Sequence, residues 1–106
     1  MHPHDQRHLE AAEGWVELGN WREANAELEN ISPRNRAHPE VLRIRWTIYC
    51  EAGKWEGAYE IAQTISNLVP DDPFGLCSMA YALHKMPAYH IIILKTSSWV
   101  CFTSDF

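Results

Sequence analysis

The chain has 106 residues and a formal net charge of −5, with 9 Lys and Arg against 14 Asp and Glu. This length allows one small domain with a modest core and excludes the two-domain cleft typical of larger enzymes. Nucleic-acid binding needs clustered Lys and Arg, and here these residues are scattered. The composition therefore argues against nucleic acid and favours a basic or amphipathic protein partner.

The cysteines and the apolar segments indicate the cellular compartment in which the protein is expected. Cys50, Cys77 and Cys101 are an odd number without CxxC spacing, so neither a disulfide framework nor a zinc site is indicated and we expect a reducing, cytoplasmic location. The chain does not begin with a basic segment followed by an apolar run, so no secretory signal is expected. The longest strongly apolar run, 91–94, is too short to span a membrane.

Two amphipathic helices are predicted in the first third of the chain. Over 5–18, apolar residues recur at helical spacing: Leu9, Ala12 and Val16. Gly19 ends this helix, and Asn20 with Glu23 has the spacing of a capping box that begins a second helix. The second helix has its own inner stripe: Ala24, Leu28 and Ile31. Pro33 ends it, because a proline disfavours helical backbone in the residue before it.

Three more helices are predicted after the polar connector 34–38. Pro39 suits the first turn of a helix over about 39–52. We expect its buried residues to be Leu42, Trp46 and Tyr49. A fourth helix, up to 68, has a broad apolar face: Ala58, Ile61, Ala62, Ile65 and Leu68. Asp72 as the N-cap and Pro73 at the first helical position then predict a fifth helix that ends near 86.

One sequence pattern occurs twice. Gly-x-Trp-x-x-Ala begins at Gly19 and again at Gly53, an offset of 53 − 19 = 34 residues. Other positions keep this offset: Trp15 with Tyr49 and Leu83, Leu28 with Ala62, and Ile31 with Ile65. The pattern resembles the tetratricopeptide repeat (TPR), a helix–turn–helix unit of 34 residues whose closing proline is matched by Pro70. The chain departs from it at Arg36, in place of the first closing proline, and at Trp46, in place of a small residue.

The resemblance implies an all-α fold in which antiparallel helix–turn–helix repeats stack as a short right-handed α-solenoid. It covers residues 5–86, with repeat one over about 5–33, repeat two over about 38–69 and the first helix of a third repeat over about 73–86. Glycines in this scheme mark turns and close packing, not a phosphate-binding loop.

Residues 87–106 break the pattern. Pro87 stands where the turn glycine is expected, and only Lys95 and Asp105 are charged in this segment. One interpretation is a short final helix over 88–95 that covers the fifth helix, followed by a frayed tail. Another is that a frameshift or altered splice has replaced the normal third repeat. In both cases the apolar segments 91–94 and 99–102 favour association if they are not buried.

The leading functional hypothesis is a non-catalytic protein–protein interaction module without cofactor or metal. In stacked repeats the first helices line a concave face, so the resemblance implies that a partner's peptide or helix binds there. The residues expected on this face are Leu9, Glu13, Val16, Glu17, Arg43, Thr47, Cys50, Tyr81 and His84. Relatives that clamp a terminal carboxylate place Lys and Asn where Leu9 and Glu13 stand, so such a clamp is not expected.

Two alternatives stay open. The chain could be a structural fragment that self-associates through residues 74–106. It could instead be a small hydrolase that uses Cys50 with His84, which requires a thiol of lowered pKa. His4 and His8 share helical spacing, but without third and fourth ligands they do not predict a metal site.

Overall fold

The computed structural model describes residues 1–86, and the part it describes is helical throughout, with no strand. The five α-helices in it are α1 (Pro3–Glu17), α2 (Trp21–Glu29), α3 (Pro39–Glu51), α4 (Trp55–Leu68) and α5 (Phe74–Lys85), and a short 3₁₀ helix, η1 (Pro33–Asn35), lies between α2 and α3. The prediction of an all-α protein is confirmed for these residues. The hypotheses on 87–106, namely a final helix, a frayed tail and a frameshifted end, lie outside the described residues.

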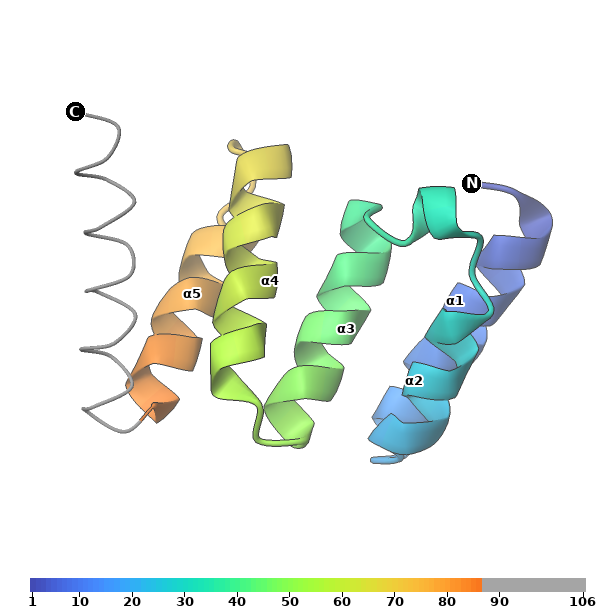
Figure 1. Ribbon diagram of the computed structural model, residues 1–106, viewed down its shortest axis with the longest axis horizontal. Coiled ribbons are helices and arrows are strands. Elements are labelled where there is room, and N and C mark those ends of the chain that lie inside the picture. Colours follow the sequence, from blue (N-terminus) through green and yellow to red (C-terminus); the bar gives the residue numbers. More distant parts are fainter. Residues whose placement is uncertain (87–106) are drawn as a thin grey trace.

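The helices alternate in direction along the molecule (Figure 1). The α1–α2 pair, then α3, then α4 with α5 follow one another along the longest axis. Within this row α1, α3 and α5 run in one direction, while α2 and α4 run in the other. Helix α3 packs on both α1 and α2, so it joins the first pair to the rest of the chain.

The two glycine turns have the same backbone geometry. Gly19 has φ of 77° and Gly53 has φ of 74°, a left-handed conformation that favours glycine. The amide after each glycine donates to a carbonyl five residues earlier: Asn20 N to Trp15 O at 2.9 Å, and Lys54 N to Tyr49 O at 2.8 Å. The repeated sequence pattern therefore corresponds to a repeated backbone structure.

Side chains cap several helix starts. The predicted cap at Asn20 is present, since its Oδ1 accepts from Glu23 N at 3.2 Å. His2 and His38, each followed by a proline, accept through Nδ1 from the amide two residues on, at 3.1 and 3.2 Å. The fifth helix begins one residue later than predicted: Pro73 is its N-cap, and Asp72 Oδ1 accepts from Phe74 N at 2.9 Å.

The hydrophobic core has two centres. The first, between α1, α2 and α3, consists of Leu9, Ala12, Ala24, Leu28, Ile31, Val41 and Ile48. The second, between α4 and α5, consists of Ala58, Ala82 and Met86. The inner stripes predicted for the second and fourth helices are buried, except that Leu68 is 52% exposed and Ile61 is half-buried.

The four tryptophans among residues 1–86 are half-buried, and Trp46 is therefore less buried than predicted. Trp15 and Trp21 are half-buried against the first core centre, and Trp46 and Trp55 against the second. Mainly aliphatic residues fill the first centre, and Ala58, Ala82 and Met86 fill the second. A Cβ on Gly75 would lie 2.7 Å from Ser66 Cα, so α4 and α5 approach each other closely at this point.

Candidate functional site

The residues predicted to face a partner lie on three parallel helices. The structure places Leu9, Glu13, Val16 and Glu17 on α1, Arg43, Thr47 and Cys50 on α3, and Tyr81 and His84 on α5. Helix α3 stands between α1 and α5 in the row, so the α1 and α5 residues lie toward opposite ends of the helical array (Figure 1).

Two α1 residues belong partly or wholly to the core. Leu9 is 0% exposed and packs in the first core centre, so its assignment to a binding face is wrong. The cause is that Leu9 lies in the cluster where α1 packs against residues of both α2 and α3. Val16 is half-buried against the same centre and offers only part of its side chain to a partner.

Arg43 is committed to a contact within the chain. Its Nη2 donates to Asp72 Oδ2, and its guanidinium lies 5.1 Å from the centre of the Phe74 ring. Asp72 and Phe74 begin α5, so Arg43 fixes the start of α5 against α3. Its charge is thus already paired within the chain, but its side chain is still 41% exposed, and recognition of a partner by Arg43 stays a prediction.

The other two α3 residues also make internal contacts. Thr47 donates through Oγ1 to the carbonyl of Arg43 at 3.2 Å, a bond within the helix. Cys50 packs against the second core centre. Burial, and to a lesser extent the nearby Glu51 carboxylate, raise the pKa of the Cys50 thiol to about 11. A raised pKa is the opposite of what a Cys50–His84 hydrolase requires.

The accessible members of the predicted set are on α1 and α5. Glu13 and Glu17 are exposed on α1. On α5, Tyr81 is 46% exposed, and its ring meets Trp46 and Trp55 edge to face at 5.8 and 6.0 Å between centroids. His84, also on α5, is exposed. The surface is therefore acidic at α1 and aromatic at α5.

Asp5 is a buried charge that the sequence did not reveal. It is 0% exposed, and it accepts from Ser32 N at 2.9 Å, Ser32 Oγ at 3.1 Å and Asn35 Nδ2 at 2.6 Å. These hydrogen bonds, the one from the Ser32 amide first, lower its pKa from 3.8 to about 2. Its partners stand 27 and 30 residues away, so no local pattern could identify them.

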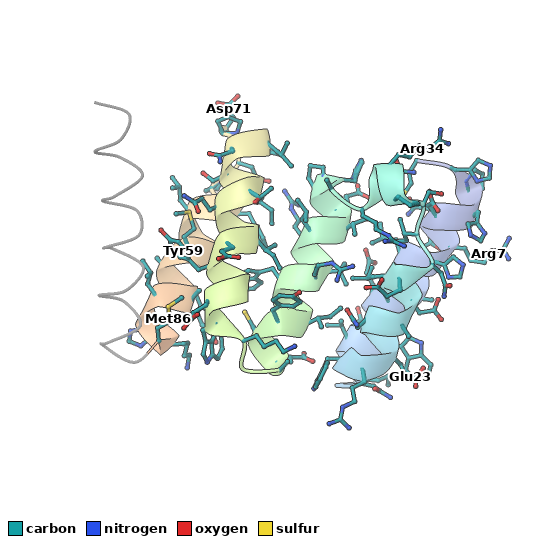
Figure 2. All side chains as sticks on the ribbon, viewed as in Figure 1. Arg7, Glu23, Arg34, Tyr59, Asp71 and Met86 are labelled. Atoms are coloured by element: carbon teal, nitrogen blue, oxygen red, sulfur yellow. The ribbon has the colours of Figure 1, made fainter. Side chains whose placement is uncertain are left out.

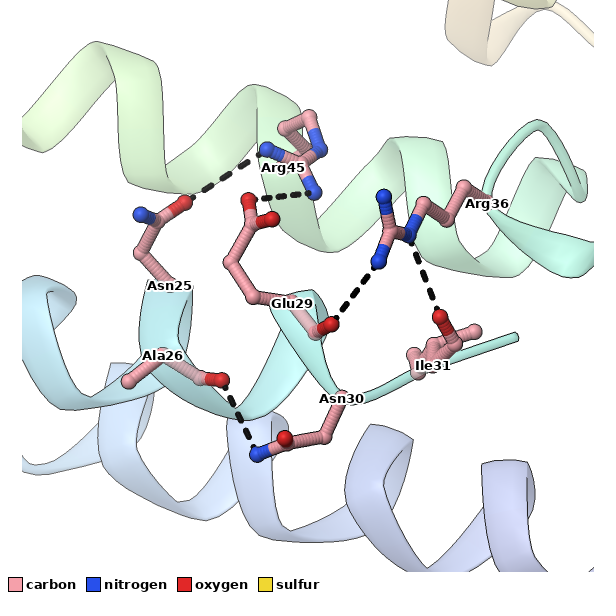
Figure 3. Close-up of polar contacts among 7 residues, drawn as sticks. All are labelled: Asn25, Ala26, Glu29, Asn30, Ile31, Arg36 and Arg45. Atoms are coloured by element: carbon pink, nitrogen blue, oxygen red, sulfur yellow. Dashed lines mark hydrogen bonds and ion pairs between the residues drawn. The ribbon is translucent and has the colours of Figure 1, made fainter. Parts of the chain in front are cut away.

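A second group of polar contacts joins α2 to α3 (Figure 3). Arg45 on α3 lies 3.6 Å from Glu29 and donates to Asn25 at 3.5 Å. Arg36, in place of the proline expected at the end of repeat one, donates to the carbonyls of Glu29 at 2.9 Å and Ile31 at 3.1 Å. Arg36 thus hydrogen-bonds carbonyls at the end of α2 that proline, which has no donor, cannot satisfy.

Other kinds of site find no support in residues 1–86. This part of the chain holds no group of three or more His, Cys, Asp and Glu side chains placed to bind a metal ion. Nor does it include a helix with the length and apolar character needed to cross a bilayer. Comparison with protein-family models, curated proteins and solved structures found no match to the chain.

Proposed function

We propose that this chain is a non-catalytic protein-interaction module with TPR-like stacked helical repeats. The row of parallel helices α1, α3 and α5 would present one face to a peptide or helix of a partner protein. The observation that carries the proposal is the recurrence, 34 residues apart, of the glycine turn with the same φ and the same backbone hydrogen bonds. Repeat units of this kind bind through the surface made by corresponding helices.

The charge of the accessible residues indicates the kind of partner. Glu13 and Glu17 are exposed on one helix, four positions apart, so they lie on the same side of it. An acidic pair at one end of the face, with the exposed aromatic Tyr81 at the other, suits a partner segment that carries both basic and apolar side chains.

Charge reversal tests this proposal. Replacement of Glu13 and Glu17 by Lys should weaken capture of the partner by at least tenfold and reduce the salt dependence of binding, since two favourable charges become unfavourable. The measurement is the affinity for the partner recovered with the wild-type chain, over a series of salt concentrations.

A matched control has the same change in net charge. Glu23 on α2 and Glu60 on α4 are also exposed, and neither helix belongs to the proposed binding row of α1, α3 and α5. Their double replacement by Lys should leave the affinity within about twofold at physiological salt, because charges away from the contact surface are largely screened. Equal losses in both double variants would contradict the proposed face.

A second candidate function, self-association through α5, is favoured by one observation. Leu76 is 62% exposed and Tyr81 is 46% exposed on the same helix, while its buried residues are the small Gly75, Ser78 and Ala82. A helix that exposes large apolar side chains such as these two offers a surface for a second copy.

Sedimentation over a range of protein concentrations tests this second function. Leu76→Lys should shift the full chain toward the monomer, whereas Leu18→Lys, at a position 76% exposed just after α1, should not. A wild-type chain that stays monomeric at all concentrations would exclude self-association.

A further inference from the structure

A pocket separate from the α1, α3 and α5 residues discussed above lies beside the α3–α4 turn. It has a volume of about 570 Å³, within the range of small-molecule sites. Tyr49 and Trp55 contribute aromatic surface to it, and Lys54, Lys85 and Glu56 contribute charged groups. The end of α5, marked by Met86 in Figure 2, lies on the same side of the molecule as this turn.

The two lysines come from different helix ends. Lys54 is the N-cap of α4, and its ammonium lies 5.8 Å from the centre of the Tyr49 ring. Lys85 is the last residue of α5, and its ammonium lies 5.5 Å from the centre of the Tyr81 ring. A lysine ammonium that lies over a ring face can still donate hydrogen bonds through its N–H groups. Among the described lining residues, the two ammonium groups of Lys54 and Lys85 are the features that favour an anionic ligand.

The equivalent turn of repeat one is built differently. There Asn20 caps α2 by accepting from Glu23 N at 3.2 Å. In repeat two the corresponding residues are Lys54, which makes no side-chain cap, and Gly57. A Cβ on Gly57 would lie 2.6 Å from the Tyr49 ring, so the missing side chain lets this ring sit against the α4 backbone as a pocket wall. In the second turn, Lys54 and Gly57 thus replace the capping pair Asn20 and Glu23 of the first turn, and the Tyr49 ring packs where a side chain at position 57 would lie.

We propose that this pocket binds an aromatic ring that carries a carboxylate or phosphate group. The ring would lie against Tyr49 and Trp55, and the anion would meet the ammonium groups of Lys54 and Lys85. Either a small aryl phosphate or an aromatic residue with a free carboxylate provides this chemistry. The site shares no residue with the proposed partner-binding set, but Tyr81 of that set contacts Trp55 and Lys85, so the Glu13 and Glu17 variants on α1 are used to separate the two proposals.

The test is a titration of the isotope-labelled full chain followed by NMR. Phenyl phosphate and N-acetylphenylalanine represent the two sources of the anion, and benzyl alcohol and inorganic phosphate represent the ring and the anion alone. We expect saturable shifts of the Gly53 and Gly57 amides and of the Trp55 indole with at least one of the aryl anions. Each control compound should bind at least tenfold more weakly. The tighter of the two aryl anions identifies the source.

Three variants locate the binding. Lys54→Asn removes one ammonium and introduces the cap residue found at Asn20, so it should keep the fold while it weakens binding about fivefold. Lys85→Gln should have a similar effect. Arg22→Gln is the matched control, because Arg22 lies 5.2 Å from the Trp21 ring in the equivalent turn of repeat one. It should leave binding unchanged.

Two results of these titrations would overturn the proposed aryl-anion site. No saturable shift with either aryl anion would overturn the proposal. Wild-type affinity of Lys85→Gln for the aryl anion would also overturn the proposal. This variant tests the proposal even if Lys54→Asn does not fold. The Glu13→Lys and Glu17→Lys double variant should keep its affinity for the aryl anion whether or not it still binds the protein partner.

Discussion

At the residue scale, Asp5 joins the beginning of α1 to the connector that closes the first helical pair. Its carboxylate accepts hydrogen bonds from Ser32 and Asn35 and is shielded from solvent. The contact joins residues far apart in the sequence, so it favours the folded chain only. Such a carboxylate links stability to pH.

Asp5→Asn should lower the urea midpoint at pH 7, and the difference from wild type should shrink as the pH falls. The folded pKa of about 2 is below the ordinary 3.8, so the stabilisation is complete above about pH 4 and is lost as the pH falls through 2. Urea denaturation at pH 7, 4 and 2 measures this. Asp71→Asn, at an exposed carboxylate, is the control. A pH-independent difference for Asp5→Asn would show that the ionised carboxylate is not the source.

The glycines of this chain differ in what they contribute. Gly53 has φ of 74° in the turn, whereas Gly14 is within α1 and has open space where a Cβ would project. Gly53→Ala should therefore destabilise the fold by about 1–2 kcal/mol through backbone strain. Gly14→Ala should stabilise it by up to about 1 kcal/mol through helix propensity. Thermal unfolding of both variants should give shifts of opposite sign, and destabilisation by both would contradict the assigned backbone conformations.

At the scale of the element, α4 and α5 are held together by small residues. Gly75 and Ser78 on α5 are buried, and Gly75 faces the backbone of Ser66 on α4. The helices therefore lie closer together than they could with larger side chains between them.

Gly75→Ala should destabilise the fold by about 1–3 kcal/mol. The new Cβ would lie 2.7 Å from the Ser66 backbone, which cannot move aside as a flexible side chain could. Leu76→Ala, on the next residue and 62% exposed, should change stability by less than about 0.5 kcal/mol. Chemical denaturation of both variants is the measurement, and similar effects from both would contradict the close approach of α4 and α5.

The helices could be predicted from sequence because their signals are local. Asn20 caps α2 as its spacing with Glu23 indicates, and Gly53 adopts the turn that its pattern requires. The boundaries shifted where two residues compete for one role, as at Asp72 and Pro73.

The candidate site was less predictable than the helices. Leu9 and Arg43 occupy positions that the repeat pattern assigns to the binding face, but Leu9 is buried in the first core centre and Arg43 hydrogen-bonds Asp72 just before α5. Such contacts depend on how neighbouring helices pack, which spacing within one helix does not encode. For the same reason the pocket beside Lys54 and Lys85 had no sequence signal, since its walls come from helices α3, α4 and α5.

At the scale of the whole molecule, the two ends of the described helical array differ. The exposed side of α1 is charged, with Glu10, Glu13 and Glu17, whereas the exposed side of α5 carries Leu76 and Tyr81. A polar outer face suits the end of a repeat array, and an apolar one suits a contact surface. Self-association is therefore proposed at the α5 end, and the acidic part of the proposed partner-binding face lies at the α1 end; Tyr81 belongs to both proposals.

Site-specific photocrosslinking tests the central claim, that a partner binds on the α1, α3 and α5 face, most directly. A benzophenone amino acid would replace Glu13 on α1 in one variant and Glu60 on α4 in another, both at exposed positions. We predict that the Glu13 variant crosslinks to one defined segment of the recovered partner and that the Glu60 variant does not. Crosslinking from position 60 with none from position 13 would contradict the claim.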